Sequence, residues 1–334
     1  MNRTIVAAIV LGRRVASLAW TAASVAAAAG AAVWFGAALL ERRRQRRDIT
    51  PAVPGREVRL AGRRVWLQES GPADSGCPTV VLLTGAGDQA ASWVLVRRRL
   101  SDSFRVVGYD RVGMGFTDDL PGPRTLPGYV DELTGVLAAA QITGPVLLVG
   151  HSFGGLIAQA YAAADPNRVA GLVLVDAVLP AMSRSRAMRT GIAVDVAAAR
   201  AFKALSPIGF TRALFAINAM PLYPEQHLLR AAASESEYRR WVGAMRAGFA
   251  GNAAREVAAV LPGAVHFQQS VTPFGGKVTV IHSRLLGTKW YRFQKDVAAQ
   301  YPDSTRIFTG NRLHNIHLSR PDLIIGAVHD QLAL

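Results

Sequence analysis

The chain has 334 residues, half of them hydrophobic, and a formal net charge of +15. That length suits one large domain with an insertion, and the hydrophobic content is ample for a sizeable core. The single cysteine, Cys77, excludes an internal disulfide and any metal or redox site built from a thiol pair.

The positive charge is unevenly distributed. Residues 1–47 contain eight arginines and one acid, Glu41, and so contribute +7 of the net +15. A strongly basic chain raises nucleic-acid binding as one hypothesis. Here the densest basic run lies directly after an apolar stretch, which favours a membrane surface. We therefore expect membrane lipid, and no nucleic acid, as a partner.

Residues 15–40 form the uncharged apolar stretch VASLAWTAASVAAAAGAAVWFGAALL. About 20 helical residues cross the hydrocarbon core of a bilayer. Trp20 and Trp34 stand toward the two ends of the stretch, where indole rings favour the interface. A cleaved signal peptide has a shorter apolar region, and a buried amphipathic helix has polar positions at a helical period. The pattern therefore predicts a transmembrane anchor over 15–40.

The flanking charges predict an orientation for this anchor. Five arginines follow the stretch and three precede it. The positive-inside rule then places the C-terminal domain of a single-pass protein on the cytoplasmic side of the membrane.

The elements predicted after the anchor alternate between strands and helices. Residues 41–55 are basic, contain Pro51, Pro54 and Gly55, and predict a linker. Residues 57–60 and 63–68 flank Ala61-Gly62, which is a hairpin signal. Further strands are predicted at 79–84, 104–110, 145–150, 170–176, 277–283 and 305–310, with helices at 93–100, 127–141, 153–164 and from residue 321. Continuous apolar strands alternating with helices predict an α/β fold with a mostly parallel central sheet covered on both faces.

Residues 181–270 interrupt this alternation. They contain several helical stretches and no strong strand, and they are too many for a connecting loop. We interpret them as a helical lid insertion between two parts of one core, 56–180 and 271–334.

The pentapeptide Gly150-His151-Ser152-Phe153-Gly154 fits the pattern G-x-S-x-G. It lies between a predicted buried strand and a predicted helix, which is the setting of a sharp turn that exposes a serine hydroxyl. The N-terminus of the new helix directs N–H groups toward the same point. Serine as a simple helix N-cap is the alternative interpretation.

Four segments together resemble the α/β-hydrolase superfamily over about residues 56–334. LLTGAGDQAASW is similar to the oxyanion loop, VVGYDRVGMGFTD to the D-R-x-G segment, GHSFGG to the nucleophile elbow, and LHNIHLSRPDLI to the catalytic-histidine loop. The resemblance implies hydrolysis of a carbonyl compound through an acyl-enzyme, with no metal and no organic cofactor. Ser152 is then the nucleophile.

A serine hydroxyl needs a base, and in this fold the chain order is serine, acid, histidine. His314 follows the last predicted strand in a loop before the last helix, where the family carries its base. Three residues further on is His317, the second candidate, which we interpret as a packing or loop-anchoring residue.

The orienting acid is less obvious because no carboxylate follows the strand 277–283, where many family members carry it. Asp176 ends the strand after the nucleophile helix, the alternative position in the fold, and we predict that it holds the imidazole. Asp296 and Asp303 are the fallback acids. Asp110 ends a strand in the D-R-x-G segment and is interpreted as structural, binding neighbouring backbone N–H groups.

The oxyanion hole is predicted to consist of the backbone N–H groups of Ala86 and Phe153. Thr84 stands where the family often has histidine, but the donors are backbone groups, so this change leaves the hole possible. The resulting hypothesis is a membrane-anchored serine hydrolase for a carboxylic ester with a hydrophobic acyl chain, a small-molecule or lipid-like substrate. Alternatives are an amide, thioester or C–C bond hydrolase with the same triad, or a membrane-tethered binding module with a retired triad.

Overall fold

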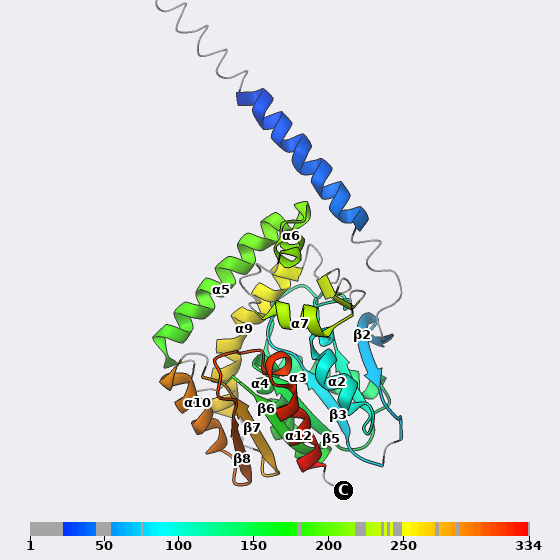
Figure 1. Ribbon diagram of the computed structural model, residues 1–334, viewed down its shortest axis with the longest axis vertical. Helices are drawn as coiled ribbons and strands as arrows, with labels where there is room; N and C mark the ends of the chain where they lie inside the picture. Colours follow the sequence, from blue (N-terminus) through cyan, green and yellow to red (C-terminus); the bar gives the residue numbers. More distant parts are fainter. Residues whose placement is uncertain are drawn as a thin grey trace, which may run out of the picture.

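An eight-stranded sheet forms the centre of the computed structural model (Figure 1). The structure describes residues 23–44, 55–74, 76–178, 182, 184–217, 225–234, 237–238, 241–242, 249–270, 274–284 and 287–332. The strand order is β1-β2-β4-β3-β5-β6-β7-β8. Their bounds are β1 Arg56–Leu60, β2 Arg63–Ser70, β3 Thr79–Leu83, β4 Val106–Tyr109, β5 Val146–His151, β6 Val169–Val175, β7 Val278–His282 and β8 Ser304–Phe308.

The six strands from β3 to β8 pair in parallel, and β1 and β2 add an antiparallel edge. The hairpin between β1 and β2 turns at Ala61 and Gly62, which both have positive φ angles, 49° and 78°. Two consecutive residues with positive φ form a type I′ turn, whose twist matches that of the flanking strands. The predicted hairpin and the predicted mostly parallel sheet are therefore confirmed.

Helices cover both faces of the sheet, which explains why its central strands are apolar throughout. Alternate residues of β3 enter different cores: Val81 and Leu83 pack in one, Val80 and Leu82 in the other. The first core contains residues of α3 Leu126–Ala139, α4 Phe153–Ala164 and α10 Thr288–Ala298. The second contains residues of η1 Ala90–Trp93, α2 Val94–Leu100 and α12 Pro321–Gln331.

The residues between β6 and β7, here called the β6–β7 segment, are helical wherever the structure describes them as regular. They form α5 Arg186–Leu205, the short η4 Ser206–Ile208, α6 Phe210–Ala216, α7 Gln226–Ala232 and α9 Phe249–Ser270. The longest two, α5 and α9, pack against each other beyond one end of the sheet (Figure 1). The role of this segment as a lid, and the domain boundaries given above, stay predictions.

A helix from Ala23 to Arg44 precedes the sheet and extends away from the body (Figure 1). Its mean hydropathy of 1.8 over 18 residues and its length are compatible with a membrane span and equally with a signal sequence. The first part of the predicted anchor, with Trp20, lies outside the described residues. Near the other end of the helix, Ala38 and Glu41 are buried, and the Glu41 carboxylate accepts a hydrogen bond of 2.9 Å from Nε of Arg212 in α6.

Candidate active site

The carboxyl ends of the parallel strands bring the predicted site residues to one edge of the sheet. Ser152 lies between β5 and α4 with φ 51° and ψ −116°, an unfavourable conformation for a residue with a side chain. The turn leaves no room for a side chain at either of its two glycines. A Cβ on Gly150 would lie 2.6 Å from the carbonyl oxygen of Gly154, and one on Gly154 would lie 2.4 Å from that of Leu83. The small residues of the G-x-S-x-G pattern are therefore required by this turn.

Asp176 follows β6 and is fully buried, with φ 43°. Its Oδ1 accepts from the backbone N–H of Ser283 and from Nε1 of Trp290, both at 2.8 Å. Its Oδ2 accepts from Oγ of Ser283 at 2.6 Å and lies 3.2 Å from Nδ1 of His314. Three donors besides the histidine thus hold the carboxylate in one orientation, which a buried carboxylate requires.

His314 lies in the loop between β8 and α11 Ile316–Ser319 and is held through its backbone as well as its ring. Its N–H donates to Oε1 of Glu225 at 3.1 Å, and its carbonyl lies 3.0 Å from Nε2 of His151. The ring of His151 lies against that of His314, with centroids 4.6 Å apart and the ring planes inclined by 50°. With Nδ1 on Asp176, the free Nε2 is the atom available as a base.

The structure brings Asp176 and His314 together, and it places Ser152 on the neighbouring turn without a hydrogen bond to the histidine ring among the described residues. Nucleophile–base contacts are often longer in unliganded enzymes and shorten when substrate binds. Among the described residues, Asp176 is the carboxylate bonded to the His314 ring; neither Asp296 nor Asp303 takes that place. The catalytic roles themselves stay predictions.

The loop after β3 packs directly against this turn. A Cβ on Gly85 would lie 3.4 Å from Cβ of Ser152. Within the described ranges, neither the N–H of Ala86 nor that of Phe153 donates to a protein acceptor. Phe153 is also the first residue of α4, whose N-terminus favours negative charge. Both predicted oxyanion donors are thus available to a ligand.

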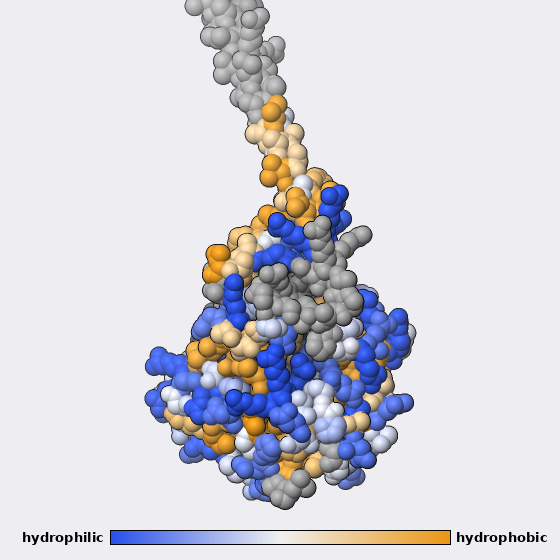
Figure 2. Space-filling model, turned by 45° about the vertical axis from the view of Figure 1, so that its right-hand side comes forward, coloured by the Kyte–Doolittle hydropathy of each residue, from blue (hydrophilic) through white to orange (hydrophobic). Residues whose placement is uncertain are grey.

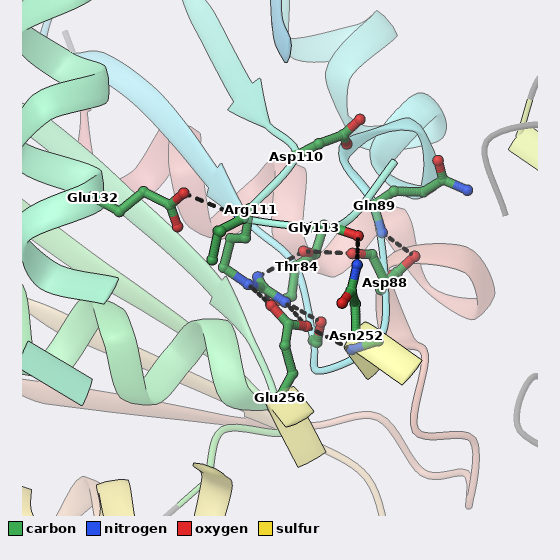
Figure 3. Close-up of polar contacts among 12 residues, drawn as sticks. Thr84, Asp88, Gln89, Asp110, Arg111, Gly113, Glu132, Asn252 and Glu256 are labelled. Carbon is green, nitrogen blue, oxygen red and sulfur yellow. Dashed lines mark hydrogen bonds and ion pairs between the residues drawn. The ribbon is translucent and has the colours of Figure 1, made fainter. Parts of the chain in front are cut away.

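A buried ion pair clamps the same loop (Figure 3). Arg111 donates from Nε and Nη2 to the two carboxylate oxygens of Glu256 in α9, at 2.7 and 2.8 Å. It also donates to the carbonyls of Thr84 and Gly85, at 2.7 and 2.6 Å, and Glu256 accepts from the N–H of Gly87 at 2.8 Å. Burial alone lowers the pKa of Arg111, but the charge and hydrogen bonds of Glu256 outweigh it, and the net pKa is raised.

Asp110 has the structural contacts that were predicted for it. Its Oδ1 accepts from the N–H of Ala90 at 2.9 Å, and its Oδ2 accepts from that of Phe116 at 3.0 Å. The nearby Glu132 accepts from the N–H of Val112 at 3.0 Å, and burial raises its pKa to about 7 despite the positive charge of Arg63. These carboxylates hold the turn that carries Arg111.

His317 is buried and contacts the rings of Trp93 and His151, at centroid distances of 4.7 and 4.8 Å. Neither ring nitrogen has a hydrogen-bond partner among the described residues, and Nε2 lies 3.9 Å from Oδ2 of Asp88. Burial, with a smaller contribution from His314, lowers its pKa to about 3. These contacts confirm the predicted packing role.

Several residues at this site were not predicted from the sequence. Ser283 stands just after β7, directly before the residues where a carboxylate was sought, and its hydroxyl donates to the carboxylate of Asp176. Glu225 and Glu256 come from the β6–β7 segment, whose sequence has no motif to single them out. In the described part of the chain, no three His, Cys, Asp or Glu side chains converge as metal ligands would.

The sequence matches the family described as alpha/beta hydrolase fold over residues 78–318, which is more than half of the chain. The chain belongs to this family. The match extends from the start of β3 to α11 and so includes every predicted site residue of this alpha/beta hydrolase.

Solved structures with the same fold include an esterase from Thermogutta terrifontis, with a TM-score of 0.60 and 18% identity. The alignment covers 84% of this chain and 98% of that one. An enol-lactonase from Burkholderia xenovorans has a TM-score of 0.61 and 19% identity, with 84% and 100% of the two chains covered. At these identities the likeness shows the fold.

A curated relative, 2-hydroxymuconate semialdehyde hydrolase from a Pseudomonas strain, is 40% identical over 126 residues. Those residues are 36% of this chain and 42% of that protein, and YqjL from Bacillus subtilis is 33% identical over 40% of its length. The chain thus matches less than half the length of either relative.

Proposed function

We propose that this alpha/beta hydrolase is a serine hydrolase that cleaves a carboxylic ester through an acyl-enzyme, with Ser152 as nucleophile. The observation that carries the proposal is the contact of Asp176 with Nδ1 of His314, beside a serine on a strained strand-to-helix turn. A buried, triply held carboxylate fixes the imidazole so that Nε2 is free to accept a proton, as a triad requires.

In the proposed reaction, Oγ of Ser152 attacks the ester carbonyl carbon while its proton moves to Nε2 of His314. The N–H groups of Ala86 and Phe153 stabilise the negative charge that develops on the carbonyl oxygen. His314 then gives the proton to the departing alcohol, which leaves an acyl group on Ser152. A water molecule, deprotonated by His314, releases the acid by the same steps in reverse.

An ester with a hydrophobic acyl chain is the substrate class that we propose. The β6–β7 segment is rich in apolar residues and lies beyond the sheet edge that carries Ser152. Two structural neighbours are an esterase and an enol-lactonase, which supports ester chemistry. A curated relative is named a semialdehyde hydrolase, so a C–C bond hydrolase with the same triad is the second candidate.

We further propose that the helix Ala23–Arg44 is a retained membrane anchor, with the hydrolase on the cytoplasmic side. A removed signal sequence has no role in the folded protein, whereas this helix contributes buried residues to it. Ala38 is 7% exposed and Glu41 is 4% exposed, and Glu41 forms an ion pair with Arg212 of α6. Losing the helix would remove the Glu41 carboxylate from Arg212.

A fluorophosphonate probe, which labels activated serines, tests the catalytic proposal on the full chain in detergent. We expect labelling of the wild type, none of Ser152→Ala and little of His314→Ala. His317→Ala is the matched control, because this second histidine, in α11, does not contact Asp176, and the variant should keep its labelling. Labelling that depends on His317 and not on His314 would refute the assignment. No labelling of a folded wild type would favour the retired binding module.

A further inference from the structure

An exposed apolar surface lies where the β6–β7 segment meets the N-terminal helix. We call Leu205, Phe210 and Ile217 the α6 surface, because they lie at the end of α5 and on either end of α6. Their side chains are 39%, 37% and 71% exposed. Large hydrophobic residues that gather on an exposed surface commonly mark a site of association with a protein or a membrane.

The N-terminal helix is fixed next to this surface. The carboxylate of Glu41 accepts from Nε of Arg212 with both oxygens, at 2.9 and 3.1 Å, and only 5% of its side-chain surface is exposed. Gly209, at the start of α6, is so close that a Cβ there would lie 3.0 Å from Oε2 of Glu41. An ion pair with one buried partner holds two elements in a fixed relation more firmly than an exposed pair does.

The position of Glu41 in its helix sets the distance of α6 from a bilayer. Trp34, an interfacial type of residue, precedes Glu41 by seven positions, which is about 10 Å along a helix. Helices that lie in the membrane interface bury their apolar face to a depth of about 5–10 Å. If Trp34 marks the interface, α6 is within reach of it.

The charges around the α6 surface suit the same environment. Arg42, Arg43 and Arg44 end the N-terminal helix and are exposed, as are Arg200 and Lys203 in α5. Figure 2 shows hydrophobic residues and hydrophilic residues side by side at the end of the body from which the helix emerges. Apolar side chains beside a cluster of cations are typical of surfaces that bind anionic lipid headgroups.

We propose that the α6 surface inserts into the headgroup region of the same bilayer that the N-terminal helix spans, so that the β6–β7 segment faces lipid. This proposal rests on the proposed membrane anchor and does not depend on which bond is cleaved. The source of the substrate is then the membrane itself. An amphiphilic ester dissolved in the bilayer enters beneath the β6–β7 segment without first crossing water. The same segment supplies Glu225 and Glu256, which hold the histidine loop and the oxyanion loop.

Quenching of a fluorescent label by brominated lipid acyl chains, which depends on the depth of the label in the bilayer, tests the proposal with the full chain in vesicles. Cys77 is the single cysteine of the sequence, so a Cys77→Ser background accepts one new cysteine at a time. A fluorescent label is attached to Phe210→Cys or Ile217→Cys, and the protein is reconstituted in vesicles of anionic and zwitterionic lipids with brominated acyl chains. The wild-type chain labelled at Cys77 is the matched control, because that residue precedes β3 at the opposite edge of the sheet. A label at Phe35→Cys reports on the N-terminal helix itself.

We expect strong loss of fluorescence at positions 210 and 217 and at position 35, and none at Cys77. Quenching at 35 with none at 210 and 217 would overturn the proposal while leaving the membrane anchor intact. Absence of quenching at all positions would overturn the anchor and, with it, this proposal. Each labelled variant is also assayed on a water-soluble ester, so that a failure of the catalytic proposal or of folding is seen separately.

Discussion

Replacing Glu256 by glutamine gives a sharp test of the clamp on the oxyanion loop. The substitution keeps the shape of the side chain and removes the negative charge that is hydrogen-bonded to Arg111. The guanidinium is 1% exposed and the carboxylate is fully buried, so water cannot take the place of the lost charge. Arg111 keeps its bonds to Thr84 and Gly85, which are neutral acceptors.

The size of the effect follows from this burial. Removing one partner of a buried ion pair costs about 3–5 kcal/mol, because a buried charge is left without compensation. That is a large part of the roughly 5–15 kcal/mol by which domains are stable. We also expect kcat/KM to fall about tenfold or more, since small displacements of positioning groups reduce rates by up to roughly 10².

Urea unfolding of the full chain in detergent, followed by tryptophan fluorescence, measures the stability change, and ester hydrolysis measures the rate. Asp322→Asn is the matched control: it breaks a pair with Arg320 in which both side chains are 40% exposed or more. Such exposed pairs contribute about 0–1 kcal/mol. A free energy of unfolding for Glu256→Gln within about 1 kcal/mol of the wild type would refute the reasoning.

Three further predictions follow from the site and the chain ends. Asp176→Asn should lower turnover by about 10⁴ in a folded protein, by analogy with the serine-protease triad, and near-normal turnover would move the orienting acid elsewhere. Burial lowers the pKa of His317 to about 3, below its ordinary value near 6.5, so the unfolded chain binds the proton more readily. The free energy of unfolding should therefore fall as the pH drops from about 6.5 toward 3. His317→Gln should weaken that dependence in urea titrations at pH 7 and pH 5, and an unchanged slope would contradict it. A reporter that works only in the cytoplasm should be active when fused to Leu334, and activity only outside would reverse the orientation.

The sequence was sufficient for the parts of the fold that depend on local patterns. Continuous apolar runs located β3, β5 and β6, and the glycines at 150 and 154 indicated the sharp turn at Ser152. The pairing of Asp176 with His314 was predictable because the carboxyl ends of parallel strands share one edge. The sequence patterns that indicate parallel strands and the strand-to-helix turn at Ser152 each span only a few residues, which explains why these elements could be predicted.

The contacts that hold the loops were not predictable, because they join residues far apart in the chain. Glu256 lies 145 positions after Arg111, and Glu225 lies 89 positions before His314. Neither glutamate differs in its local pattern from a solvated acid on a helix. Pro262 lies inside α9, which further obscures that helix in the sequence. Only the packing of the β6–β7 segment against the sheet edge in the folded protein distinguishes these two glutamates from solvated acids.

The separation of Arg111 from Glu256 also has a consequence for biosynthesis. At about 5–20 residues per second, a ribosome needs roughly 7–30 s to add the 145 residues between them. During that interval the oxyanion loop and Arg111 have been synthesised, but the Glu256 carboxylate that pairs with Arg111 has not. The first half of the hydrolase therefore lacks this contact during its synthesis. We expect a nascent chain released before residue 256 to be bound by chaperones or degraded by proteases instead of forming a stable core.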